Sequence, residues 1–147
     1  MKGENLMLTS KKKIFRLTSL ILTVVLCLSL FTPIAHARAS NYIFSYGASM
    51  VADGNGKVSV WFDITGTGTM DEIGSTTIIV YENGVAVKTF SYSTTPSMMT
   101  YNKHIHGSSV TYQGVAGRSY YALVIFWAAK QGAGDNRSMT TATITAK

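Results

Sequence analysis

The chain has 147 residues, which is room for one domain, with 13 basic and seven acidic residues. Residues 40–147 hold seven of the basic and six of the acidic residues, so this part is nearly neutral, and we expect no nucleic-acid partner. The one cysteine, Cys27, precedes this part, which excludes a disulfide or a cysteine-based metal site from residues 40–147.

Residues 1–39 have the order of a cleavable export signal. Basic residues at 11–13 and 16 precede an apolar run from 17 to 31, and Pro33 ends that run. Two overlapping Ala-x-Ala triplets follow, so we predict cleavage after Ala37 or Ala39. An uncleaved membrane anchor is the alternative, because residues 14–35 approach the ~20 needed to cross a bilayer. We favour the signal, which resembles those of Gram-positive bacteria, and expect a secreted mature protein that does not span the membrane.

From residue 40 onward, short runs of alternating apolar and polar residues are separated by clusters of Gly, Asn, Asp and Ser. No stretch has the 3.6-residue apolar period of a helix. This pattern predicts a single all-β domain over 40–147, an antiparallel β-sandwich of about seven strands. We expect strands at 42–51, 57–65, 76–82, 85–92, 108–112, 118–129 and 137–146.

Four connections between these strands have recognisable signals. Residues 53–56, Asp-Gly-Asn-Gly, and the pair Asn83-Gly84 suit tight turns with positive φ. Gly114 and Gly117 bracket a third turn. Residues 66–75 are expected to form a long connection, in which Thr69-Met70-Asp71-Glu72 matches a capping box and predicts one helical turn.

Residues 117–124, Gly-Arg-Ser-Tyr-Tyr-Ala-Leu-Val, with the Gly-rich turn and Thr-rich strand after them, resemble the last two strands of a fibronectin type III domain. The resemblance implies a sandwich of fibronectin type III or immunoglobulin-like kind, with a Tyr packed at a corner. Val58, Val60 and Phe62 match the family's second strand, but Trp61 lies one residue before the family's usual Trp. Residues 65–68, 70–74 and 119–122 also resemble an uncharacterised, domain-of-unknown-function family of small secreted Firmicutes proteins, which implies no activity.

No set of residues predicts catalysis, a metal or a cofactor. His104 and His106 could share Zn²⁺ or Cu²⁺ if extended, but two ligands are too few. The 53–56 turn offers two oxygen side chains where a Ca²⁺ loop supplies six or more, so we interpret it as a plain turn. Asp71 and Glu72 are adjacent, whereas a glycosidase needs two carboxylates facing each other. We therefore predict that the protein is not an enzyme.

The aromatic residues are the remaining functional signal. Val58, Val60, Phe62 and Ile64 share one face, so Trp61 leaves the strand on the other face, between polar neighbours. Tyr81 and Tyr121 could extend the same patch. The strand at 118–129 is apolar on both faces, and either face could be the buried one. We predict binding residues at Trp61, Tyr81 and Tyr121; the alternative is that loops or neighbouring strands cover them.

We therefore expect a secreted, non-enzymatic binding or adhesion module, associated with the cell envelope, whose partner is an envelope polysaccharide or a protein. The alternatives from other classes are a small secreted hydrolase and a secreted toxin or signalling protein.

Overall fold

The computed structural model describes residues 40–147 and places 76% of them in strands. The expected export signal, with Cys27 and the cleavage sites at Ala37 and Ala39, lies outside these residues. Between residues 40 and 147, no helix is long and apolar enough to cross a membrane.

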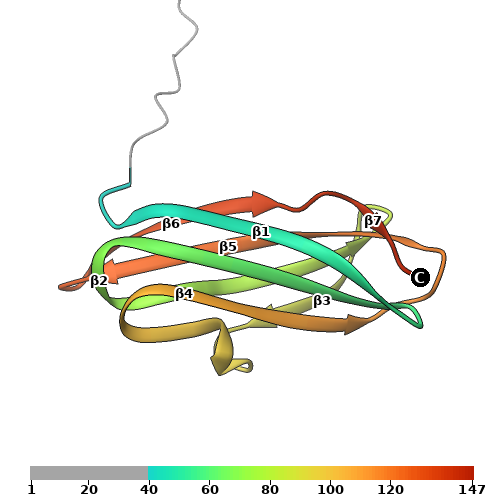
Figure 1. The fold of residues 1–147 in the computed structure, drawn as a ribbon, viewed down its shortest axis with the longest axis horizontal. Coiled ribbons are helices and arrows are strands. Elements are labelled where there is room, and N and C mark those ends of the chain that lie inside the picture. Colours follow the sequence, from blue (N-terminus) through green and yellow to red (C-terminus); the bar gives the residue numbers. More distant parts are fainter. Residues whose placement is uncertain (1–39) are drawn as a thin grey trace, which may run out of the picture. The chain divides into compact units, whose positions relative to one another are not determined.

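Seven strands and one short 3-10 turn make up the described part of the chain (Figure 1). Every strand pairing is antiparallel, so the prediction of an all-β antiparallel domain with about seven strands is confirmed. The elements are β1 (Ile43–Gly54), β2 (Lys57–Glu82), β3 (Val85–Ser91), η1 (Pro96–Met98), β4 (Met99–Gln113), β5 (Ser119–Lys130), β6 (Ala133–Thr140) and β7 (Ile144–Thr145).

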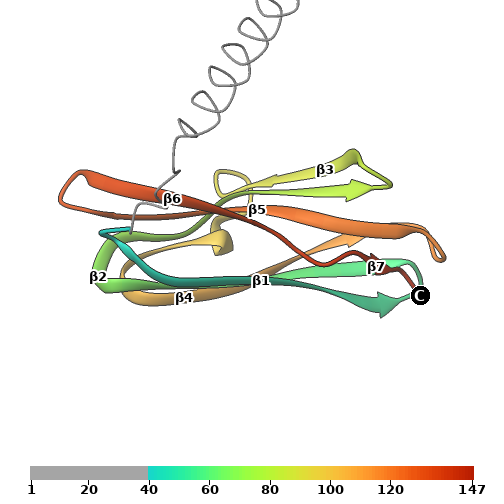
Figure 2. The same ribbon diagram turned by 90° about the horizontal axis from the view of Figure 1, so that it is seen from above.

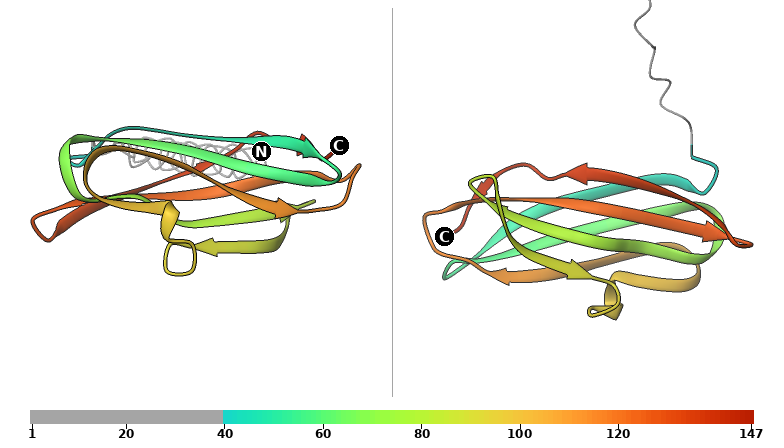
Figure 3. Two further views of the ribbon diagram at one scale, coloured as in Figure 1. Left: turned by 60° about the horizontal axis from the view of Figure 1, so that its bottom comes forward. Right: turned by 180° about the vertical axis from the view of Figure 1, so that it is seen from behind.

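The long strand β2 makes the sheet curl back on itself. Its first part, 57–65, pairs with β1 and with residues 105–113 of β4. Its last part, 77–82, pairs with β3 and β5. As a result β1 and β4 lie on one side and β3, β5 and β6 on the other (Figure 2). The loop before η1 and η1 itself project beyond the end of β3 (Figure 3).

The expected long connection with a helical turn at 66–75 is wrong, because these residues continue β2. Residues 70–74 pair with 99–103 of β4, and 72–75 pair with β5, so this part of the strand has a partner on each edge. Pairing along both edges of the strand supplies hydrogen bonds to more backbone N–H and C=O groups than one helical turn could. Glu72, the residue that suggested the cap, instead accepts a hydrogen bond from Trp127 Nε1 at 3.0 Å.

Two other strands have different bounds from those expected. β4 begins at Met99 rather than at 108, because its first residues pair with the bent part of β2 and need no apolar alternation of their own. The single last strand expected at 137–146 is divided into β6 and β7. β6 begins as early as Ala133, since Gln131 and Gly132, with φ of 52° and 77°, form the tight turn into it.

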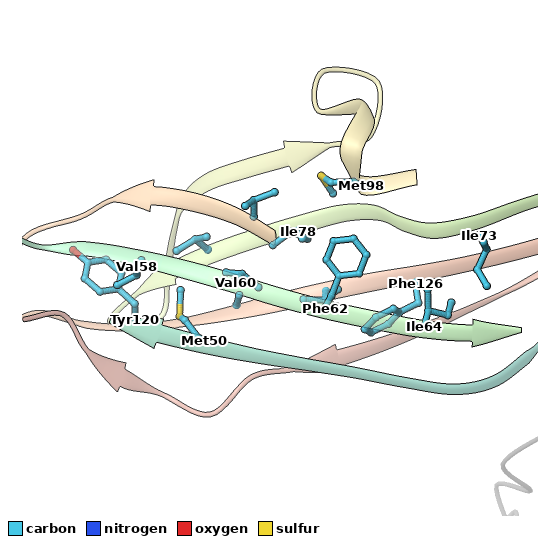
Figure 4. Packing of buried hydrophobic residues seen from close by; sticks show 14 of the residues in the cluster. Met50, Val58, Val60, Phe62, Ile64, Ile73, Ile78, Met98, Tyr120 and Phe126 are labelled. Carbon is cyan, nitrogen blue, oxygen red and sulfur yellow. The ribbon is translucent and has the colours of Figure 1, made fainter. Parts of the chain in front are cut away.

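The core lies between the two sides of the curled sheet (Figure 4). β2 contributes Val58, Val60, Phe62 and Ile64 from one side, and Phe126 of β5 meets Phe62 edge-on with ring centroids 6.4 Å apart. The buried residues of β5 settle which of its two apolar faces is inside. Those on the inner face are Tyr120, Ala122, Val124, Phe126 and Ala128, each fully buried.

Tyr120 joins β5 to the turn before it. Its hydroxyl accepts a hydrogen bond from the Val115 backbone N–H at 2.9 Å and donates one to Glu82 Oε2 at 2.8 Å. Glu82 also pairs with Arg118, and these two partners, Arg118 first, lower the pKa of Glu82. Burial raises the pKa of Tyr120. Gly114 leaves the space for the ring, because a Cβ there would lie 2.7 Å from the Tyr120 hydroxyl oxygen.

Candidate functional site

Trp61 stands on the outer surface of the β1–β2–β4 side. Its strand neighbours Val60 and Phe62 point into the core, so Trp61 points away from it, and 53% of the residue is exposed. The residues beside it across the sheet are Ser49 of β1 and Ser109 of β4, which are too small to cover an indole. The predicted outward facing of Trp61 is confirmed, while its role in binding stays a prediction.

Asp63 lies next to Trp61 on the same face, two residues further along β2, and it is flanked by Gly47 of β1 and Gly107 of β4. A Cβ added to Gly47 would lie 2.9 Å from Asp63 Oδ1, so the carboxylate leans over this glycine. Among residues 40–147, the Asp63 side chain has neither a hydrogen bond nor an ion pair. An exposed carboxylate is thus presented beside an exposed indole, with no side chain on either flank.

These residues surround an open hollow of about 560 Å³ that crosses three strands. Trp61 provides an apolar wall and Asp63 an acceptor, while glycine and serine positions leave the strand backbones accessible. Met139 of β6, which is 38% exposed, adds an apolar side chain. The lining consists of Gly47, Ala48, Ser49, Trp61, Phe62, Asp63, Gly107, Ser108 and Met139. We call it the Trp61 hollow.

A hydrogen-bonded polar group continues the same face toward the β1–β2 turn. Ser59 Oγ donates to Asp53 Oδ2 at 2.5 Å and shares a hydrogen bond with Thr111 Oγ1 at 2.9 Å. The Asp53 carboxylate is therefore hydrogen-bonded to a side chain of the protein, unlike the carboxylate of Asp63. The turn after Asp53 has the expected positive φ, at Gly54, Asn55 and Gly56.

Tyr81 and Tyr121 do not extend the patch around Trp61. They pair with each other across β2 and β5, with their rings stacked at a centroid distance of 4.9 Å and an angle of 5°. Both are half-buried, and they belong to the other side of the curled sheet. The expectation of one joined patch is wrong because β2 bends between Trp61 and Tyr81, which places its two ends on opposite sides.

The outward face of β5 beyond Tyr121 is also apolar. Leu123, Ile125 and Trp127 are half-buried there. The Trp127 indole rests against Gly134 of β6, where a Cβ would lie 2.6 Å from the ring, and its N–H is bonded to Glu72. These contacts give Trp127 a structural role that Trp61 does not have.

Of the other polar residues singled out by the sequence, His106 and Asp71 have hydrogen-bond partners in the fold. His106 Nε2 forms a hydrogen bond with the Ser97 carbonyl oxygen at 2.9 Å, and its ring packs edge-on against Phe62. His104 is exposed. Asp71 Oδ2 accepts the Gln131 N–H at 2.7 Å. Within residues 40–147, no group of three His, Cys, Asp or Glu residues is placed to hold a metal ion.

Sequence reasoning identified Trp61 but missed Asp63 as a site residue. Alternation alone puts Asp63 on the same face as Trp61, so this much could have been inferred. The two glycines beside Asp63, which leave its side chain uncovered, could not have been inferred, because they come from strands whose register only the fold defines. Comparison of the chain with protein-family models, with curated proteins and with solved structures found no match.

Proposed function

We propose that residues 40–147 form a non-enzymatic binding module of a secreted protein, and that the module holds its ligand in the Trp61 hollow. The observation that carries this proposal is the exposed indole beside a carboxylate without a partner among the described residues. Exposing an indole contributes little to folding, whereas a concave surface with an aromatic wall and one polar group suits ligand recognition.

We further propose that the fold is an immunoglobulin-like sandwich of the fibronectin type III kind. The strand order β1–β2–β4 on one side and β3–β2–β5–β6 on the other supports this, if the two ends of β2 are counted as separate strands. Tyr120 also supports it, because its hydroxyl bonds back to the backbone of Val115, as the tyrosine of the corner motif in such domains does. The unbroken β2 and its pairing with residues 99–103 depart from that pattern.

Binding is favoured over hydrolysis by the number of acidic groups. Of the residues that line the hollow, Asp63 is the one with a carboxylate. Cleavage of a glycosidic bond commonly uses a pair of carboxylates on opposite sides of the bond. Asp53, on the same face, is held by Ser59. A secreted hydrolase, or a toxin or signalling protein, remains the alternative that activity and cell assays would reveal.

Capture of candidate ligands by the purified protein tests the proposal. The protein is immobilised and presented with envelope polysaccharide fractions and with secreted proteins, and capture is compared between Trp61→Ala and Tyr101→Ala. Tyr101 is a matched control because it is 56% exposed on β4 but does not line the hollow. We expect Trp61→Ala to lose capture and Tyr101→Ala to keep it. Equal capture by both variants would overturn the assignment of the site.

A further inference from the structure

From the charge and shape of the Trp61 hollow we infer that its ligand is an uncharged polysaccharide chain. This inference rests on the proposed function, since it assumes that the hollow is the binding site. It adds the chemical class of the ligand and assigns Asp63 as the acceptor of its hydroxyl groups.

The charge of the hollow disfavours an anionic ligand. Asp63 is the one charged residue of its described lining. Lys57, the lysine of the same strand segment, is six residues from Asp63, which is about 20 Å along an extended strand. Screening in about 0.1 M salt acts over about 10 Å, so Lys57 does not compensate Asp63. A uronate or phosphate polymer would therefore meet a carboxylate, and no cation among the residues that line the hollow.

The single aromatic wall disfavours a cationic ligand as the specific one. Ammonium groups are typically recognised by cages of several aromatic faces. The hollow has one exposed ring, that of Trp61. Its other aromatic lining residue, Phe62, is 3% exposed and turns its ring into the core against Phe126 and His106. One flat ring and one carboxylate do not make such a cage.

A sugar ring suits both groups at once. Its C–H face is apolar and flat enough to lie on the Trp61 indole, and its hydroxyls lie around the rim. The Asp63 carboxylate has two oxygens and can accept from two neighbouring hydroxyls, and charge-assisted O–H···O⁻ hydrogen bonds are stronger than neutral ones. Gly107 leaves room for the ring to approach the carboxylate from the β4 flank, while the carboxylate itself lies over Gly47.

The hollow is shaped for part of a chain rather than for a single enclosed molecule. It crosses from Gly107 of β4 over β2 to Gly47 of β1, a distance of about 10 Å at the usual strand spacing, and Met139 of β6 adds a contact beyond β1. Because both flanks of Asp63 are glycines, no side chain closes the hollow on either of them. A polymer can therefore pass across the strands, with one ring on Trp61 and its neighbours over β1 and β4.

Tryptophan fluorescence can test this inference, because the chain contains two tryptophans and Trp61 is the exposed one. In a Trp127→Phe variant, the tryptophan fluorescence comes from Trp61 alone. The probes are oligosaccharides of equal length: neutral β-1,4-glucan, β-1,3-glucan, β-1,4-mannan and chitin oligomers, an anionic oligogalacturonate and a cationic chitosan oligomer. We expect a saturable change with at least one neutral probe, and weaker or no change with the two charged probes.

Two variants separate this inference from the proposed function. Asp63→Asn should weaken binding of the neutral probe about fivefold, since a neutral acceptor makes weaker hydrogen bonds than a carboxylate. Asp135→Asn, which removes a charge on β6, should leave binding unchanged. Lack of response with every neutral probe, or stronger binding of a charged probe at Trp61, overturns the inference about the ligand but does not contradict the proposed function. If calorimetry shows undiminished binding by Trp61→Ala, both proposals fail.

Discussion

Replacing Tyr120 with phenylalanine should destabilise the domain although it leaves the core ring in place. The change removes one oxygen atom that accepts from the Val115 N–H at 2.9 Å and donates to Glu82 at 2.8 Å. Each hydrogen bond is worth roughly 1 kcal/mol net, so the loss for the tyrosine hydroxyl is about 2 kcal/mol. In a domain of this size that corresponds to a fall in Tm of roughly 10 °C.

Urea unfolding, followed by tryptophan fluorescence, measures this loss, and Tyr112→Phe is its matched control. The Tyr112 ring packs against Tyr120 at 6.0 Å, but within the described residues its hydroxyl makes no hydrogen bond. We expect a lower midpoint for Tyr120→Phe, an unchanged slope, and little change for Tyr112→Phe. If the free energies of unfolding of both variants lie within about 0.5 kcal/mol of that of the unaltered protein, the hydrogen bonds of the Tyr120 hydroxyl do not stabilise the domain.

The remaining predictions concern acid stability, a close backbone contact and processing. The guanidinium beside Glu82 lowers its pKa below the ordinary 4.5, so the stability that Glu82 contributes is present above pH 4.5 and is lost as the pH falls through the lower folded value. Thermal melts of Glu82→Gln should lack this part of the acid dependence, and an unchanged acid profile would contradict it. Gly74→Ala should cost about 3 kcal/mol or more in urea unfolding, because its Cβ would lie 2.2 Å from a carbonyl oxygen of the facing backbone. Gly68→Ala, where a Cβ meets nothing within 4 Å, is the control and should be nearly neutral. N-terminal mass analysis of the protein in culture medium should show cleavage after Ala37 or Ala39, and an intact Met1 in a membrane fraction would refute export by a cleaved signal.

Local patterns were enough where one strand or one turn decides the outcome. The alternation of Val58, Val60 and Phe62 placed Trp61 outside, because a strand with one buried face must expose every second residue. Asn83 and Gly84 predicted a tight hairpin, and both have positive φ in the structure. These features depend on neighbours in the chain, so the chain pattern reveals them.

Local patterns failed where distant segments decide the outcome. Residues 66–75 contain three glycines and a capping box, yet they form strand because β4 and β5 supply partners on both edges. The first residues of β4, which include Asn102 with a φ of 53°, show no apolar alternation and are held by pairing with β2. The propensity of a short segment is worth less than the hydrogen bonds that such partners provide.

The sequence by itself therefore determined that residues 40–147 are an antiparallel all-β domain without cysteine, and that Trp61 faces outward. Only the tertiary structure decided which face of β5 is buried and that Tyr81 and Tyr121 lie away from Trp61. It also placed Asp63 between Gly47 and Gly107. Facing depends on the two-residue period of a single strand, whereas neighbours across a sheet depend on register and on the bend of β2, which brings together residues far apart in the chain.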